Sequence, residues 1–440
     1  MDLIIQHIAQ LLTLSPSPNS LGEGRGEVKP RGEGKARVGS QMSDLGIIED
    51  GLVAVHEGKI TAVGKTAELK PKLKLRPDTK VIDAESQVVM PGFVDCHTHL
   101  VYGGSREEEF EQRACGATYQ EIAARGGGIR STVKATRAAS KPELHQAALK
   151  RLSRMLLWGT TTAEAKSGYG LSTDSEIKIL EVIRDLNSTQ VIELVPTFRG
   201  AHEFPDEYRK SNNDIDREGY VRLICEEMLP QVKELGLAEF CDVFCDDGVF
   251  TPAEAERILE AASNLGLVPK IHADELSSAG AAEIAAKVRA ISAEHLLHPS
   301  RTGLELMKDA GTIAVLLPGT SLTLKKQYAP ARKMIEMGIP VAVASDHNPG
   351  SCTIETMPIV IGLACLNLGL TPAEAICAAT YNAACAIDRG DKIGSVELGK
   401  QADLIILDIP NYRYLPYHFG VNYVRTVVKN GKVVVGSTTN

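Results

Sequence analysis

The chain has 440 residues, with 48 lysines and arginines against 56 aspartates and glutamates, and so a formal net charge of −8. This length exceeds one small core and is that of a large barrel with an appendage, or of two to three domains. A mildly acidic chain without basic blocks argues against a nucleic-acid or membrane binder. No signal segment is recognisable, and nine cysteines without framework spacing indicate reduced thiols in a cytoplasmic protein.

Both ends of the chain have the pattern of short β-strands. Between the first of these runs and the next, residues 15–40 are rich in Gly, Pro, Glu, Lys and Arg, which predicts a long exposed loop. We predict a β-sandwich domain built from residues 1–90 and 387–440. The runs that predict its strands are 3–14, 51–56, 59–64, 80–84, 403–408 and 424–435.

The middle of the chain, residues 91–386, alternates short apolar runs with longer amphipathic stretches. Eight such alternations predict an α/β domain that closes as a (β/α)8 TIM-type barrel. A doubly wound open sheet is the competing topology, and it would show a Gly-x-Gly-x-x-Gly turn after the first strand. The predicted strands are 93–100, 161–167, 191–198, 240–246, 267–274, 291–297, 311–318 and 340–347, and helices are expected at 140–158, 175–186 and 251–265.

The first predicted barrel strand ends in His97-Thr98-His99 instead of a glycine-rich turn. Residues two apart in a strand point to the same side, so both imidazoles can face a single metal ion. A bare His-x-His pair is more often a pair of surface histidines. Its position at the end of an apolar strand favours the metal site.

Matching groups stand at the ends of three later strands, namely His272, His295 and Asp346. In barrel enzymes the chemistry takes place at the C-terminal ends of the strands. Three histidines and an aspartate suit zinc or iron and leave one position open for water. One such residue alone would be an ordinary hydrogen-bonding group, but the combination predicts a metal centre.

Hydrolysis at such a centre also needs a group that carries protons. A bound metal ion lowers the pKa of water and polarises a carbonyl, and a nearby carboxylate then moves the proton. Glu275 lies three residues after His272, where the strand gives way to a loop, and we predict that it is this acid/base group. The alternative is an ordinary carboxylate at the start of a helix.

Other motifs have simpler interpretations. Cys241 and Cys245 lie on one strand without a second cysteine pair, and we interpret them as buried thiols. Gly126 to Gly128 lack the Lys-Ser/Thr of a phosphate loop, and a tight turn or hinge beside the site is expected.

With these residues in place, the chain resembles the amidohydrolase superfamily, whose members carry His-x-His, His, His and Asp on strands one, five, six and eight. Within it, the motifs are similar to those of the branch that opens the ring of 4-imidazolone-5-propanoate in histidine degradation. The matching stretches are Gly103-Gly-Ser-Arg106, Ala124-Arg-Gly-Gly-Gly-Ile, Glu164-Ala-Lys-Ser-Gly-Tyr169, Gly200-Ala-His202, Cys225-Glu-Glu-Met-Leu-Pro and Asp346-His-Asn348-Pro-Gly350-Ser351.

The resemblance implies a role for each matching residue. One metal ion, zinc or iron, is expected, because the bridging lysine of dinuclear relatives belongs on the fourth strand. That strand has no lysine here, and Lys166 ends the second. His295 would hydrogen-bond the attacking water or the substrate, and His347 receives no role. The implied metal ligands are His97, His99, His272 and Asp346; the catalytic groups are Glu275, His295 and Asp346; and the substrate-binding residues are Arg106, Tyr169, His202, Asn348, Gly350 and Ser351.

The residues themselves agree with a substrate that carries a carboxylate. A guanidinium holds a carboxylate by two parallel hydrogen bonds, and Arg106 lies in the first strand-to-helix loop, although without the resemblance it would be a surface arginine. One alternative is an aminohydrolase that deaminates a purine or pyrimidine, which Arg106 and Tyr169 suit less well. A second is a non-catalytic scaffold barrel, which would have lost a ligand. The oligomeric state is not readable, and a homodimer is one option.

Overall fold

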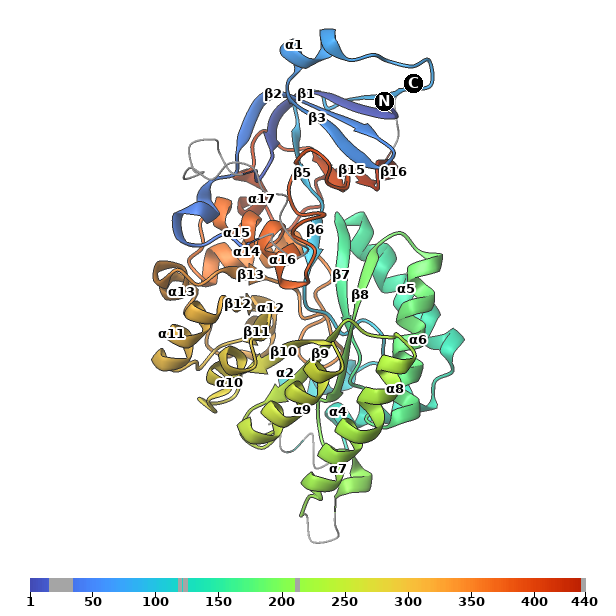
Figure 1. Ribbon diagram of the computed structural model, residues 1–440, viewed down its shortest axis with the longest axis vertical. Coiled ribbons are helices and arrows are strands. Elements are labelled where there is room, and N and C mark those ends of the chain that lie inside the picture. Colours follow the sequence, from blue (N-terminus) through green and yellow to red (C-terminus); the bar gives the residue numbers. More distant parts are fainter. Residues whose placement is uncertain (16–34, 118–120, 122–125, 210–213, 437–440) are drawn as a thin grey trace.

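The computed structural model describes residues 1–15, 35–117, 121, 126–209 and 214–436. Its strands form two sheets of eight strands each, one wholly parallel and one mixed. In Figure 1 the mixed sheet, built from the blue and red ends of the chain, lies above the parallel sheet and its surrounding helices. The fold class predicted from the sequence is thus confirmed.

All eight predicted strands of the parallel sheet are present, and each pairs with the next in chain order. The first and last strands do not form a ladder with each other. Instead the sheet closes into a barrel through a parallel bridge between Thr98 and His347. The strands are β6 (Phe93–Asp95), β7 (Thr160–Lys166), β8 (Glu193–Ala201), β9 (Phe240–Cys245), β10 (Val268–Ala273), β11 (Ser292–His295), β12 (Ile313–Leu316) and β13 (Val341–Val343).

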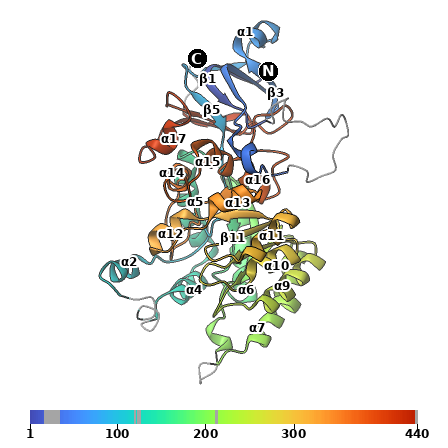
Figure 2. The ribbon, with the colours of Figure 1, turned by 90° about the vertical axis from the view of Figure 1, so that its left-hand side faces the viewer.

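Helices surround this barrel, as the two perpendicular views in Figures 1 and 2 show. The helix predicted at 251–265 begins with a capping box, in which the Thr251 hydroxyl accepts from the Glu254 N–H and the Glu254 carboxylate accepts from the Thr251 N–H. The barrel helices are α2 (Glu107–Ala114), α4 (Ile129–Ala138), α5 (Lys141–Leu157), α6 (Thr173–Thr189), α7 (Arg217–Leu223), α8 (Leu229–Glu234), α9 (Pro252–Asn264), α10 (Ala281–Lys287), α11 (Arg301–Ala310), α12 (Pro318–Leu324), α13 (Ala331–Met337), α14 (Met357–Asn367), α15 (Pro372–Ala378) and α16 (Tyr381–Ala386).

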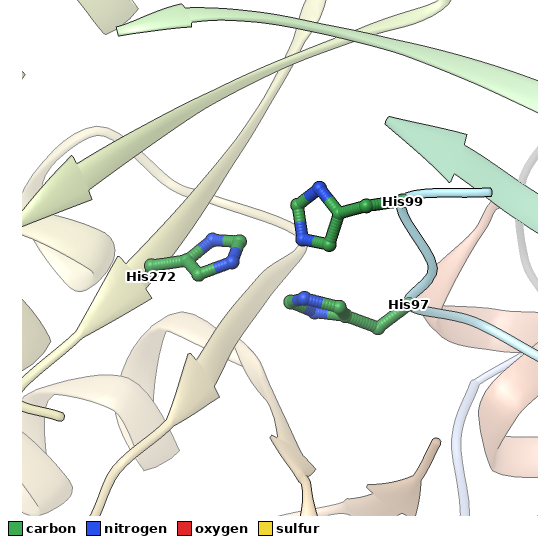
Figure 3. Close-up of side chains that lie close together, drawn as sticks. All are labelled: His97, His99 and His272. Atoms are coloured by element: carbon green, nitrogen blue, oxygen red, sulfur yellow. The ribbon is translucent and has the colours of Figure 1, made fainter. Parts of the chain in front are cut away.

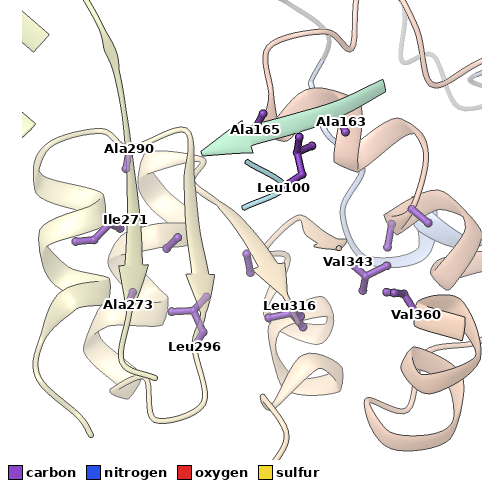
Figure 4. Close-up of a cluster of buried hydrophobic side chains, with 14 of the residues drawn as sticks. Leu100, Ala163, Ala165, Ile271, Ala273, Ala290, Leu296, Leu316, Val343 and Val360 are labelled. Carbon is purple, nitrogen blue, oxygen red and sulfur yellow. The ribbon is translucent and has the colours of Figure 1, made fainter. Parts of the chain in front are cut away.

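The hydrophobic core lies between the barrel strands and these helices. Figure 4 shows part of it, with Ala163 and Ala165 of β7 and Ile271 and Ala273 of β10. Because side chains alternate along a strand, the intervening residues of β7 and β10 face the interior of the barrel. On β7 they include Glu164 and Lys166, and on β10 Lys270 and His272, and these four side chains determine the character of the site.

Strands from both ends of the chain form the mixed sheet, in the order β16-β15-β14-β5-β1-β2-β3 with β4 beside β1. They combine edge to edge in one continuous sheet, which gives the predicted composite β structure. The division at residues 90/91 and 386/387 stays a prediction. The strands are β1 (Leu3–Leu12), β2 (Ile47–His56), β3 (Lys59–Lys65), β4 (Lys80–Asp83), β5 (Val88–Pro91), β14 (Leu404–Leu407), β15 (Val424–Lys429) and β16 (Lys432–Val435).

Most of the loop predicted at 15–40 lies outside the described residues, which resume at 35. The expected exposure is wrong for Arg37, which is only 7% exposed. Its Nη2 donates to the Leu14 carbonyl (2.6 Å) and its backbone N–H to Asn382 Oδ1 (2.8 Å). The guanidinium is buried because it satisfies carbonyls that the chain would otherwise bury without partners. None of the described helices is long and apolar enough to cross a bilayer.

Candidate metal centre and active site

Three histidines converge at the C-terminal end of the barrel. His97 and His99 follow β6, and His272 is the penultimate residue of β10. Their ring centroids are 5.3 Å (His97–His99), 4.5 Å (His97–His272) and 5.7 Å (His99–His272) apart, and Figure 3 shows the rings turned toward one another. All three are buried. The structure therefore brings the His-x-His pair and the strand-five histidine into one cluster.

Asp346 joins this cluster from the other side of the barrel closure. Its backbone N–H donates to the His97 carbonyl (3.1 Å), and the His99 N–H donates to the His347 carbonyl (2.8 Å). These bonds place Asp346 Oδ1 3.3 Å from His97 Nε2 and 3.7 Å from His99 Nε2. Burial by itself would raise the pKa of Asp346, but the adjacent His97 lowers it to about 2. The carboxylate is therefore ionised.

Two of the clustered residues adopt backbone conformations that L-residues rarely take. Asp346 has φ +52° and His295, the last residue of β11, has φ +70°. Such strain occurs where surrounding contacts enforce it, and it is concentrated at functional sites. His295 lies with its ring centroid 5.0 Å from that of His272. Ligand atoms of His97, His295 and Asp346 also lie within 4.8 Å of one another.

The donor set fits a metal ion. Burial holds the pKa values of His99 and His272 well below the usual range, so both imidazoles are neutral and keep a lone pair. Among the described residues, His99 Nδ1 is buried without a hydrogen-bond partner, and His97 Nε2 faces only the Asp346 carboxylate, at 3.3 Å. A buried polar atom without a partner is costly, and a cation would satisfy it. Three imidazoles and one carboxylate are typical ligands of zinc and of iron.

Glu275 lies beside the cluster in the loop after β10. Its carboxylate is 3.5 Å from His295 Nε2 and 3.6 Å from Lys326 Nζ. Asp246, just after β9, accepts hydrogen bonds from the backbone N–H groups of Glu275 (2.8 Å) and Leu276 (2.7 Å). The position of Glu275 is thus determined by its backbone as well as by its side chain.

Tyr169 and His202 lie against His99. The His202 ring is stacked on that of His99 at 5.8 Å, and the Tyr169 ring is 5.9 Å from His99. His202 Nδ1 donates to the Gly168 carbonyl (2.8 Å), which leaves Nε2 as an acceptor. Burial lowers the pKa of His202 well below its usual range, so it is neutral. The buried carboxylate of Glu176 accepts from the N–H groups of this loop at Gly168, Gly170 and Leu171 (2.9, 2.7 and 2.8 Å).

Arg106 stands just before α2, beside the loop that follows β13. Its Nε and Nη2 donate to Glu109 Oε2 (2.9 and 2.7 Å), and its Nη1 packs so closely on Gly350 that a Cβ there would clash. Gly128 N–H donates to the other Glu109 oxygen (2.9 Å), and its positive φ (+79°) agrees with the predicted tight turn. The Glu109 carboxylate thus links the turn at Gly128 to Arg106.

Asn348 organises the loop after β13. Its Oδ1 accepts the N–H groups of Gly350 and Ser351, both at 2.8 Å, and its Nδ2 donates to the Asp346 carbonyl at 2.7 Å. The three pocket residues predicted after the last strand therefore lie directly beside the predicted ligand. His347 is also buried, and its Nε2 lies 3.4 Å from the Tyr102 hydroxyl.

The sequence analysis missed a layer of buried charges beneath the histidines. Its signal was present, since Glu164 and Lys166, and likewise Lys270 and His272, alternate with apolar residues on strands that had to be buried. Cys241 and Cys245 are buried free thiols, as predicted. The members of the buried layer are Glu164, Lys166, Arg199, Asp242, Lys270 and Glu294, each at most 2% exposed.

Comparisons with known proteins agree with this geometry. Residues 88–434 match the amidohydrolase family. An imidazolonepropionase of Geobacillus sp. (strain WCH70) is 50% identical over 436 residues, which cover 99% of this chain and 98% of the relative. One of Symbiobacterium thermophilum is 53% identical over 437 residues, covering 99% and 97%.

Solved structures that resemble this one have low sequence identity. A zinc-bound adenosine deaminase of Xanthomonas campestris has a TM-score of 0.69 at 19% identity and covers 99% of this chain and 93% of its own. The guanine deaminase of E. coli has a TM-score of 0.67 at 14% identity, with 99% of each chain covered. At such identities the likeness shows the fold alone.

The chain belongs to the amidohydrolase family of metal-dependent hydrolases. This agrees with the buried histidine and carboxylate cluster at the strand ends. Within that family it belongs with the imidazolonepropionases, since the identity of about half extends over nearly the whole of both chains.

Proposed function

We propose that this protein hydrolyses 4-imidazolone-5-propanoate to N-formimidoyl-L-glutamate. One water molecule is consumed, its oxygen bonds to the ring carbonyl carbon, and the amide C–N bond of the ring breaks. The observation that carries the proposal is the 50% identity to an imidazolonepropionase over 99% of this chain. The cluster of three histidines and Asp346 supports it, because hydrolysis of an unreactive amide needs an activated water.

We propose His97, His99, His272 and Asp346 as the ligands of one zinc or iron ion. A metal ion bound there would supply Lewis acidity, which makes a water molecule more acidic and polarises the ring carbonyl. The four side chains come from three separate parts of the barrel and are all buried. Ligand atoms of His97, His99 and His272 already lie within 4.8 Å of one another, and Asp346 Oδ1 lies 3.3 Å from His97 Nε2.

Glu275, His295 and Asp346 are our candidates for proton handling. The carboxylate of Glu275 takes up the proton that the water loses and passes it to the departing ring nitrogen. His295 lies within 3.5 Å of this carboxylate and would hold the attacking water or the substrate in line. Asp346 is ionised at neutral pH and competes for the same proton. General acid–base catalysis of this kind contributes about 10²–10⁴-fold to the rate.

We propose that Arg106 binds the propanoate group and that Tyr169 and His202 bind the imidazolone ring. The support is that the two aromatic side chains pack against His99, one of the proposed ligands. Arg106 approaches from the opposite loop, where Gly350 leaves room for its guanidinium. We place Asn348, Gly350 and Ser351 in the wall of the same pocket.

Replacing Arg106 with methionine should raise KM for the substrate and lower kcat/KM by roughly 10–100-fold. The reason is that a hydrogen bond to a charged group contributes about 1.5–3 kcal/mol, which the apolar side chain cannot supply. Steady-state kinetics measure both constants. Arg130→Met is the matched control, because Arg130 pairs with Asp206 on the surface. Equal kinetic constants for wild type and Arg106→Met would refute the assignment.

The reaction is tested by following the loss of imidazolone absorbance with purified protein whose metal content is measured on the same sample. Rapid turnover with one metal ion per chain supports the proposal. Ammonia release from guanine or cytosine without imidazolone turnover would favour a deaminase instead. Metal-free protein that cannot be loaded with metal would revive the scaffold alternative.

Two further expectations from the sequence stay predictions, namely a homodimer and a cytoplasmic location. None of the nine cysteines forms a disulfide in the structure, which is the state expected in a reducing compartment.

A further inference from the structure

Six charged side chains fill the barrel directly beneath the proposed metal ligands. Lys166, Lys270 and Arg199 supply three positive charges, and Glu164, Asp242 and Glu294 supply three negative ones. All six are at most 2% exposed, so water does not screen them. The proposed mechanism uses none of these groups.

This layer contacts three of the proposed ligands: Arg199 Nη1 lies 3.2 Å from His99 Nε2, and two of its carboxylates face the other histidines. Glu294 Oε2 lies 2.7 Å from His97 Nδ1, and Asp242 Oδ2 lies 2.8 Å from His272 Nδ1. An imidazole whose Nδ1 faces a carboxylate presents its Nε2 to a metal ion, and such partners orient and strengthen the ligand. The two carboxylates therefore have to stay in place for the histidines to be correctly aimed.

The same carboxylates also form cation-binding groups of their own. Ligand atoms of His97, Glu164 and Glu294 lie within 4.8 Å of one another, and so do those of Asp242, His272 and Glu294. Each group has donors that zinc accepts. These two donor groups adjoin the proposed metal centre, with which they share His97 and His272.

An ammonium group already lies between these carboxylates. Lys166 Nζ is 3.0 Å from Glu164 Oε1, from Asp242 Oδ2 and from Glu294 Oε2. Lys270 Nζ contacts Glu164 (2.8 Å) and Glu294 (3.0 Å) but does not reach Asp242 within ion-pair distance among the described contacts. Lys166 is thus the cation that the two donor groups share.

We infer that Lys166 acts as a fixed internal cation that occupies the place of a second metal ion and so restricts the centre to one. The inference rests on the proposed metal centre. Without the ammonium, three carboxylates would face two positive charges in the dry interior. A divalent cation entering between Glu164, Asp242 and Glu294 would more than replace the missing positive charge.

The test counts zinc ions per chain in wild type and in Lys166→Ala. Metal-free protein is titrated with Zn²⁺ by calorimetry, and the bound metal is counted by elemental analysis after gel filtration. Wild type should bind one equivalent, and Lys166→Ala should bind two. The matched control is Lys429→Ala, which removes another buried lysine paired with a carboxylate (Asp403, 2.8 Å) in the terminal sheet. It should bind one equivalent.

A folded Lys166→Ala that binds one equivalent would overturn the inference. If alanine prevents folding, Lys166→Gln and Lys166→Arg replace it. Lys166→Gln, which removes the charge, should bind the second zinc ion, and Lys166→Arg, which keeps the charge, should not. If Lys166→Gln has to be refolded in the presence of zinc, its Tm is measured against the amount of zinc added. A Tm that keeps rising up to two equivalents supports the inference, and a Tm that stops rising at one equivalent contradicts it. Failure of wild type to bind any zinc would instead count against the proposed function.

Discussion

Glu275→Gln is expected to lose roughly 10²–10⁴-fold in kcat, the range that acid–base catalysis contributes, while its metal content stays at that of wild type. Glutamine has the size of glutamate but neither accepts nor releases a proton at neutral pH. The loop should keep its position, because Asp246 binds the backbone N–H of residue 275 and not its side chain. Single-turnover kinetics and elemental analysis measure the two quantities on one preparation.

The matched control for this experiment is Glu254→Gln. Glu254 is a carboxylate at the start of a helix, in the capping box of α9, which is the ordinary role that Glu275 would have if it were not catalytic. We expect Glu254→Gln to be slightly less stable than wild type and to keep the turnover of wild type. If Glu275→Gln behaves like Glu254→Gln, the acid/base role belongs to another group, with His295 and Asp346 as the next candidates.

The second large effect is expected for His272→Ala, which should bind zinc more weakly by more than about 100-fold and lose nearly all turnover. Removing a residue that only hydrogen-bonds a metal ligand already lowers metal affinity about 10–100-fold. His272 is proposed as a direct ligand, so a larger loss is expected. Its removal leaves two histidines and Asp346. Competition with a chromogenic chelator measures the affinity, and circular dichroism shows whether the fold is intact.

A surface histidine provides the comparison for this variant. His145 lies on α5 and bonds the Thr189 hydroxyl, far along the chain from any proposed ligand. His145→Ala should retain wild-type metal affinity and turnover. A His272→Ala variant that kept both would mean that the ion is held elsewhere, and the proposed ligand set would be wrong.

Much of the candidate site was visible in the sequence because its signals are local. The His-x-His spacing follows from the two-residue period of a strand, and Thr251 with Glu254 marks a helix start through contacts three residues apart. The strand ends could be located for the same reason. The roles of Arg106 and His202 were different, since only the resemblance to a family singled them out from surface residues.

The sequence by itself determined the eight strands, the helices between them and the strand-end residues able to bind a metal, because periodicity and capping depend on near neighbours. Only the tertiary structure decided that Thr98 and His347 close the barrel and that Asp246 holds the loop of Glu275. It also decided that Asp242 and Glu294 lie beside Lys166. These partners lie tens to hundreds of residues apart, and which of them meet depends on the packing of the whole barrel.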